Sequence, residues 1–210
     1  MTQNQKDTEE KILEAAKEVF IKKGMEGARM QEIADLAGIN KALLHYYFRT
    51  KEKLFDTVFK LAFSYFVPKI TDIMSSEKSL FEKIEVFVDS YISLLINYPY
   101  IPRFIINELS RNPDRVVEFI DKITGSSEYR NNLFSKLEIQ IQKEIKEGKI
   151  NFIEPKQLII NMIALCIFPF VGKPIVKGVF FNNDKKIYNE FLKQRKTEVA
   201  NFIINSIKKK

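Results

Sequence analysis

The sequence predicts an all-α protein of about nine helices, and three observations support this. Apolar residues recur at helical spacing over nearly the whole chain, and no segment shows the strict alternation of a half-buried strand. Proline or glycine also stands at most of the expected helix ends. The 210 residues are 45% hydrophobic and 29% charged, a globular composition, and neither an internal repeat nor a Pro/Gly/Ser-rich linker divides them.

The first predicted elements lie in the amino-terminal quarter of the chain. An amphipathic helix is expected to start behind Asp7, which can form a capping box with Glu10. Gly24 can end that helix in the left-handed conformation. Two short helices are then predicted over 30–37 and 41–48.

A longer helix is predicted from 51 to 74, with Thr50 as its cap and with a kink or an end at Pro68. Further helices are predicted over 80–95, 104–109, 114–146 (whole or broken at 125–127), 158–168 and 184–207. Pro155 fits the first turn of the 158–168 helix, and Gly148 can stop the helix before it.

Aromatic and aliphatic side chains are expected to form the core of the later helices. The aromatic residues predicted to be buried are Phe63, Phe66, Phe81, Phe87, Tyr91, Tyr98, Phe104, Phe134, Phe168 and Phe170. On the last helix, the residues predicted to point inward are Ile187, Phe191, Val199, Phe202 and Ile203.

Charge favours a nucleic-acid partner without locating it. The formal net charge is +7, but over 1–60 there are 11 basic and 10 acidic residues. The stretch 41–53 has 4 basic residues and 1 acidic residue, and 185–210 has 8 basic and 2 acidic residues. A basic tail is often only a solvated helix face, so a motif must locate the surface.

Several classes of protein and site are disfavoured by the composition. One cysteine and one histidine exclude an internal disulfide and most metal sites, and no metal or cofactor is expected. The polar start of the chain is unlike a signal peptide. The longest apolar stretch, 158–172, contains Asn161 and Pro169 and is shorter than the roughly 20 residues that span a bilayer. We therefore expect a cytoplasmic protein without a membrane partner.

The segment 30–49, MQEIADLAGINKALLHYYFR, has the pattern of a helix-turn-helix. Two helices can cross closely at the small Ala34, and Gly38 suits a turn that requires positive φ. The side chains predicted to form the inward face are Ile33, Ala37, Ile39, Leu44 and Tyr47. The outer face of the second helix then carries Lys41, Ala42, His45, Tyr46 and Arg49, which suits a reader of the major groove. A helical hairpin with no DNA role is the alternative.

The same residues carry a resemblance to a known family. The segments ILEAAKEVFIKKG and IADLAGINKALLHYYFRTKEKLF, within 8–59, resemble the amino-terminal domain of the TetR family of transcriptional regulators. The resemblance implies a homodimeric repressor that places one recognition helix per subunit in the major groove of a palindromic operator. It also implies a DNA-binding domain over 1–52 and a ligand-binding and dimerisation domain over 53–210.

The resemblance assigns the DNA contacts residue by residue. Lys41 matches the family lysine at the start of the recognition helix and is expected to reach a phosphate or a guanine. Lys51 matches the lysine at the start of the fourth helix, where a phosphate is favoured, and His45 stands where the family usually has a phosphate-binding tyrosine. A neutral imidazole can still donate one hydrogen bond, so this contact is expected to be weaker or sensitive to pH. Arg29 replaces a threonine that caps the second helix, so that helix start should be looser. The complete set of expected DNA-binding residues is Arg29, Asn40 (the N-cap of the recognition helix), Lys41, Ala42, Leu43, His45, Tyr46, Tyr47 and Lys51.

The resemblance places an effector cavity and a dimer interface in the later helices. The expected effector is a small, mostly apolar molecule, and the expected contacts are Phe66, Tyr91, Arg103, Phe104, Asn107, Glu108, Asn161 and Phe168. The stretch 158–171 and the last helix are the surfaces assigned to the dimer.

Two other functions are weighed against this one. A DNA-bound structural protein could use the same fold to recruit a protein partner without any small-molecule effector. An enzyme is disfavoured because Cys166 and His45 are far apart in the sequence and no paired carboxylates stand out.

Overall fold

A computed structural model describes residues 3–64, 66–99, 101–102, 106, 110, 113–114, 117–118, 121 and 127–209. The described residues form helices and no named strand, with one isolated β-bridge between Ile150 and Lys208. The all-α prediction is therefore confirmed. The chain divides into two compact units. The first comprises Met1–Tyr65 and Arg103–Ile123, and the second comprises Phe66–Pro102 and Thr124–Lys210.

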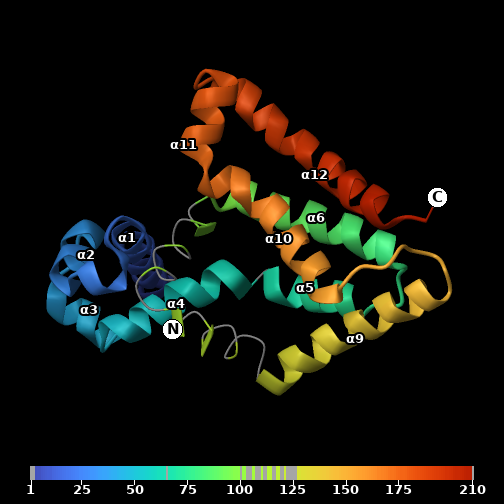
Figure 1. Ribbon diagram of the computed structural model, residues 1–210. Helices are drawn as coiled ribbons and strands as arrows, with labels where there is room; N and C mark the ends of the chain where they lie inside the picture. Colours follow the sequence, from blue (N-terminus) through green and yellow to red (C-terminus); the bar gives the residue numbers. More distant parts are fainter. Residues whose placement is uncertain are drawn as a thin grey trace. The chain divides into compact units, whose positions relative to one another are not determined.

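The first unit is built on four helices. They are α1 (Gln3–Gly27), α2 (Met30–Ala37), α3 (Lys41–Tyr47) and α4 (Lys51–Ser64). α1 packs against α2 and α4, and α2 packs against α3 (Figure 1). The rings of Phe20 on α1 and Phe55 on α4 meet edge to face, with centroids 5.0 Å apart, and both are buried. The core of this unit thus joins the first and fourth helices beneath the helix-turn-helix.

The start of α1 differs from the prediction. α1 begins at Gln3, so Asp7 lies inside the helix, and the predicted capping box at Asp7 and Glu10 is wrong. The residues before Asp7 are mostly polar with good helix propensity, so nothing in the sequence stops the helix from extending toward the amino terminus. Gly24 does adopt the predicted positive φ, +68°, although helical structure resumes after it.

The turn between α2 and α3 has the predicted geometry. Gly38 is left-handed at φ +68°, and its N–H and that of Ile39 donate to the carbonyls of Asp35 and Ala34 at 3.2 and 3.0 Å. These two bonds satisfy carbonyls at the end of α2 in the manner of a Schellman motif. Asn40 caps α3, because its Oδ1 accepts from the N–H of Leu43 at 2.7 Å.

The second unit has α6 in contact with several other helices. Its elements are α5 (Phe66–Ser75), α6 (Leu80–Asn97), α9 (Ser127–Lys146), α10 (Pro155–Val171), α11 (Lys173–Ile175), the π-helix η1 (Val176–Phe180) and α12 (Lys185–Ile207). α6 packs against α5, α10 and α12. Gly148 has a positive φ (+68°) just after the end of α9, and Pro155 is the first residue of α10, so both predictions are confirmed. Asp184 caps α12. The predicted helix over 104–109 falls mostly outside the described residues, as does the break at 125–127.

The residues of the predicted helix over 51–74 fall in α4 and α5, with residue 65 between them outside the described residues. α5 continues through Pro68, so no helix ends at this proline, and the predicted kink there stays a prediction.

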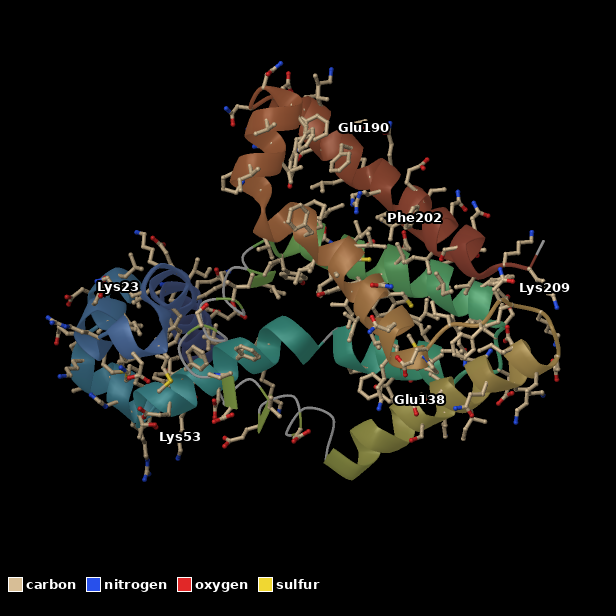
Figure 2. All side chains as sticks on the ribbon, viewed as in Figure 1. Lys23, Lys53, Glu138, Glu190, Phe202 and Lys209 are labelled. Atoms are coloured by element: carbon tan, nitrogen blue, oxygen red, sulfur yellow. The ribbon has the colours of Figure 1, made fainter. Side chains whose placement is uncertain are left out.

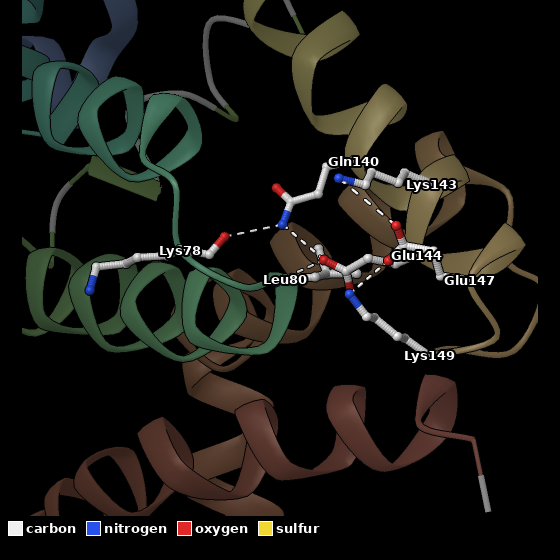
Figure 3. Close-up of polar contacts among 7 residues, drawn as sticks. All are labelled: Lys78, Leu80, Gln140, Lys143, Glu144, Glu147 and Lys149. Carbon is white, nitrogen blue, oxygen red and sulfur yellow. Dashed lines mark hydrogen bonds and ion pairs between the residues drawn. The ribbon is translucent and has the colours of Figure 1, made fainter.

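A polar network ties α9 to the connection between α5 and α6 (Figure 3). Gln140 donates from Nε2 to the carbonyl of Lys78 at 3.1 Å and to Glu144 at 2.9 Å, and Glu144 also accepts from the N–H of Leu80 at 3.3 Å. Beneath it, the buried Lys83 donates to Gln140 Oε1 at 2.7 Å and to the carbonyl of Met74 at 2.9 Å. Burial lowers the pKa of Lys83, and these acceptors compensate its ammonium group.

Several residues predicted to be buried are exposed. Phe134 on α9, Phe168 on α10, and Ile187 and Phe202 on α12 all have large exposed fractions, so these predictions are wrong for the single chain. On α12 the buried positions are instead Tyr188, Leu192, Val199, Ala200, Ile203 and Ile207. Ile187 and Phe202 each stand one residue before a buried position, on an apolar strip that packing within one chain leaves uncovered.

Among the described residues, no single helix is long and apolar enough to cross a membrane. The α10 helix and the segment 173–180 would pass together by length and composition, but they are bent by 62° at the break between them.

Candidate DNA-binding surface

The second helix of the helix-turn-helix presents most of its side chains to solvent. Leu44 is buried against the core of the first unit, which fixes the rotation of α3 about its own axis. The opposite side of the helix is consequently exposed, and 73% of the surface of Tyr46 is accessible to solvent. The other exposed residues of α3 are Lys41, Ala42, Leu43 and His45. A seven-residue helix with cationic and aromatic side chains on its open side can reach base edges and phosphates together.

Tyr46 and Tyr47 have different environments although they are adjacent. Their rings meet edge to face with centroids 5.6 Å apart. The hydroxyl of Tyr47 donates to the carbonyl of Gln5 on α1 at 3.4 Å, so this half-buried residue anchors α3 to α1. The contact with that anchored ring limits the rotamers of Tyr46 before any ligand arrives, although most of the Tyr46 surface is open to solvent.

The ring of His45 is held by the backbone beyond the end of α3. Its Nδ1 lies 3.2 Å from the carbonyl oxygen of Arg49. A carbonyl can only accept a hydrogen bond, so Nδ1 carries the proton in this contact. The residue as a whole is exposed.

Two other predicted contacts are placed at the edge of this surface. Arg29 occupies the N-cap position of α2 and makes no side-chain cap, as expected for arginine, and its side chain is exposed. Lys51 donates from Nζ to the carbonyls of Glu26 and Ala28, both at 3.2 Å. The lysine therefore holds the end of α1 against the start of α4, which leaves one of its three hydrogens for an outside acceptor.

Some charged side chains near α3 form ion pairs, and others are exposed to solvent. Glu32 on α2 pairs with Lys23 at 2.8 Å. Lys41 has no ion pair with any residue that the structure describes, and Lys53 extends into solvent from the first turn of α4 (Figure 2). The open cations thus lie on α3 and the start of α4, in the stretch where the sequence concentrates positive charge.

The residues predicted to bind an effector are not brought together in the described part of the chain. Tyr91 is buried on α6, and burial raises the pKa of its hydroxyl. Asn161 and Phe168 are both exposed on α10. The side chains of Phe66, Arg103, Phe104, Asn107 and Glu108 lie outside the described residues, so the set remains a prediction.

The sequence reasoning missed a half-buried cation in the second unit. Arg195 on α12 donates from Nη2 to the carbonyl of Leu165 at 2.7 Å, and its guanidinium lies 5.6 Å from the ring centre of Phe191. Desolvation lowers the pKa of Arg195. A groove of about 310 Å³ beside it is lined by Leu165, Arg195, Glu198, Val199 and Phe202. The spacing of Phe191, Arg195 and Val199 by four residues is the signal that could have identified it.

No group of three or more histidine, cysteine, aspartate and glutamate side chains in the described ranges could hold a metal ion.

Comparison with known proteins connects this geometry to a family. The family model described as "Bacterial regulatory proteins, tetR family" matches residues 12–58, which include the whole helix-turn-helix. The chain is 30% identical over 164 residues to IcaR, a biofilm operon negative transcriptional regulator of Staphylococcus aureus, covering 75% of this chain and 79% of IcaR. It is 28% identical over 160 residues to the transcriptional regulator RutR of Escherichia coli, covering 73% of this chain and 69% of RutR. It is 35% identical over 89 residues to the repressor NicS of Pseudomonas putida, a match that spans only 42% of NicS and 40% of this chain.

Solved structures show the same fold over nearly the full length. HlyIIR, a hemolysin II transcriptional regulator, has a TM-score of 0.64 at 24% identity and covers 98% of this chain and 99% of its own. A TetR/AcrR-family regulator from Thermobifida fusca has a TM-score of 0.59 at 16% identity, covering 93% and 97%. With its capped, outward-facing α3 and these matches, the chain belongs to the TetR family of DNA-binding transcriptional regulators.

Proposed function

We propose that this regulator is a repressor that binds a palindromic operator as a homodimer and is released by a small, mostly apolar ligand. The observation that carries the DNA part is the exposed face of α3, where Lys41, His45 and Tyr46 are open to solvent on a helix that Gly38 and Asn40 hold in place. The words "repressor" and "negative" in the names of NicS and IcaR support repression as the direction of control.

The homodimer is supported by an uncovered apolar strip on two helices that pack against each other, α10 and α12. Its exposed members are Ile160, Ile163, Phe168, Val171, Ile187 and Phe202. Large apolar side chains left exposed on neighbouring helices are typical of interaction surfaces. A two-fold axis through such a strip would bury the same residues of both copies. The recognition helices should then contact half-sites about 34–36 Å apart, or a multiple of this distance.

The ligand-induced release rests on weaker support, from the second unit alone. It starts from Tyr91, a buried residue with a polar end on α6, because a few polar groups orient a ligand in a mostly apolar pocket. A ligand can lower operator affinity only if it binds the DNA-incompetent state more tightly. The segment 51–74 has residues in both units, and this is where we place the coupling.

Selection of bound duplexes from a random pool tests the DNA part. We expect a palindromic consensus, and the affinity of variants for it can be compared by fluorescence anisotropy. Tyr46→Ala should change the preferred base at one position of each half-site, because an exposed side chain on this helix reads bases. Lys41→Ala should weaken all sequences alike and flatten the salt dependence by about one unit per subunit, because it removes one phosphate contact. Recovery of no enriched sequence at low ionic strength would contradict the proposal.

A ligand screen tests the release. Apolar compounds that raise the melting temperature of the protein should lower its affinity for the selected operator, and Tyr91→Phe should weaken compounds that use the hydroxyl. If every stabilising compound leaves operator affinity unchanged, the protein acts without an effector, as in the alternative in which it recruits a protein partner on DNA.

A further inference from the structure

α12 carries a stripe of four residues that is symmetric about its centre, except that the two central residues have opposite charges. Phe191, Arg195, Glu198 and Phe202 are spaced by four, three and four residues, so they lie along one face of the helix. The point midway between Arg195 and Glu198 is also midway between the two phenylalanines. Reversing the helix therefore places a phenylalanine against a phenylalanine and a cation against an anion.

This α12 stripe borders a groove on the surface of the second unit. Phe191 and Arg195 are half-buried, whereas Glu198 and Phe202 are exposed. Arg195, Glu198 and Phe202 line one groove of about 310 Å³, together with Leu165 of α10. Phe202 also belongs to the exposed apolar strip of α10 and α12. The groove therefore lies on the surface that we propose meets a second copy of the chain.

A proline in α10 explains the position of Arg195. Pro169 has no N–H, so the carbonyl of Leu165, four residues earlier, lacks the helical donor that another residue would supply. Nη2 of Arg195 donates to this carbonyl at 2.7 Å, and the guanidinium lies 5.6 Å from the ring centre of Phe191. These two contacts hold the guanidinium at the groove, and the bond to Leu165 uses one of its five hydrogens.

Arg195 and Glu198 are the two charged residues of the stretch 190–198 that have no ion pair with any described residue. Lys193 pairs with Glu190 at 3.7 Å, and Lys196 pairs with Asp89 of α6 at 3.0 Å.

The guanidinium of Arg195 is thus partly desolvated without a counter-ion. Its buried Nε has no hydrogen-bond partner in the described part of the chain. A charge that is removed from water is costly unless an opposite charge lies beside it. A carboxylate that enters the groove from outside the chain would supply the missing charge.

We propose that Arg195 forms an ion pair with Glu198 of the partner subunit, twice across the two-fold axis, and that these pairs set the register in which two copies associate. The inference rests on the proposed homodimer and names the residues that align it. A two-fold axis perpendicular to α12 makes its two copies antiparallel, so that Phe191 meets Phe202 of the partner subunit at the same time. A parallel arrangement would oppose each charge to its own kind.

The ion pairs would select the same chain as the partner. Charged pairs at an interface contribute to specificity because a wrong partner leaves a charge unpaired or opposed by a like charge. A regulator of the same fold without an acidic residue at this place would leave the guanidinium of Arg195 without a counter-ion.

Charge reversal tests the pairing, with the dimer dissociation constant of the full chain measured by analytical ultracentrifugation. Glu198→Arg should weaken the dimer at least about tenfold, because two cations then face each other on both sides of the axis. Glu190→Arg is the matched control. It makes the same change of charge at an exposed position of α12 outside the stripe and should leave the dissociation constant unchanged.

Mixing two variants distinguishes a pair between subunits from a pair within one chain. Arg195→Glu should also weaken the dimer, but an equimolar mixture with Glu198→Arg should form a heterodimer, since both contacts again join opposite charges. Circular dichroism checks that Arg195→Glu is folded, because it loses the bond to Leu165. If it is not folded, a cycle of Arg195→Gln, Glu198→Gln and the double variant replaces it, and the second substitution should then cost little once the first is present.

Two results would overturn the inference while leaving the proposed homodimer intact. One is a dimer of Glu198→Arg as tight as that of Glu190→Arg. The other is the absence of coupling, seen as a mixture without heterodimer or as additive effects in the cycle. A wild type that stays monomeric both in free solution and on its selected operator would instead refute the proposed homodimer.

Discussion

Burial sets the chemistry of Cys166, the one cysteine of the chain. It is fully buried on α10, and desolvation raises the pKa of its thiol to about 12, partly opposed by the charge of Arg195. The folded protein therefore keeps a neutral thiol under conditions in which an exposed cysteine would ionise. The sequence shows only that the cysteine stands on an apolar helix, whereas the neighbouring guanidinium comes from α12, 29 residues later.

This burial predicts how stability changes at alkaline pH. The pKa of the thiol is higher in the folded state than its ordinary value of 9.0, so the stability that the neutral thiol contributes is complete below pH 9 and is lost between pH 9 and about 12. The loss should approach about 1.4 kcal/mol per pH unit. Urea unfolding of the wild type and Cys166→Ala at pH 8, 9 and 10 measures it. The free energies of unfolding should converge as the pH rises, and parallel curves would show that the thiol ionises equally in both states.

At the scale of helices, a boundary was predictable where a cap or turn acts on backbone groups a few residues away. It was not predictable where a possible cap competes with continuation of the helix. Asn40 and Gly38 act on backbone groups within a few residues, so their roles follow from local sequence alone. Asp7 has equally good capping chemistry, but the residues before it continue the helix.

The cap of α3 makes a prediction that separates stability from DNA binding. Asn40→Ala removes the hydrogen bond to Leu43 and should cost about 1 kcal/mol. Because α3 has only seven residues, loss of its first turn should also weaken operator binding. Ser79→Ala is the matched control: it removes the capping box of α6 at a similar cost in the second unit and should leave operator affinity unchanged.

Asn40→Ser then distinguishes a cap from a DNA contact. Serine can restore the cap, so affinity measured by anisotropy should recover with the stability measured by urea unfolding. If Asn40→Ser loses as much affinity as Asn40→Ala while its stability recovers, the amide itself contacts DNA.

At the scale of the whole molecule, the apolar strip of α10 and α12 is the surface that packing within a single chain leaves exposed to solvent. Tyr188, Leu192 and Ile203 face the core of the second unit, while Ile187 and Phe202 remain open on the same helix. The prediction of an inward-facing Ile187 and Phe202 was wrong because α12 has two adjacent apolar stripes and periodicity does not rank them.

The proposed dimer predicts the effect of a charge in this strip. Phe202 is 66% exposed, so Phe202→Asp should leave the monomer fold intact but place a carboxylate in the apolar contact between copies. Analytical ultracentrifugation should show a shift from dimer to monomer, together with weaker operator binding. Phe152→Asp, which changes an exposed phenylalanine in the loop between α9 and α10, is the control and should remain dimeric. Equal behaviour of the two variants would place the dimer interface elsewhere.

The sequence alone determined the all-α class, the turn at Gly38, the cap at Asn40 and the face of α3 that is open to solvent. These features depend on the helical period and on groups a few residues apart, which any reader of the sequence can count. Tertiary structure decided which stripe of α12 is buried, which acceptors hold Lys51 and Lys83, and how the ring of His45 is bonded. Each of these depends on contacts between segments that are distant in the sequence. Helical periodicity shows which residues share a face of one helix, but it does not show which other segment that face contacts.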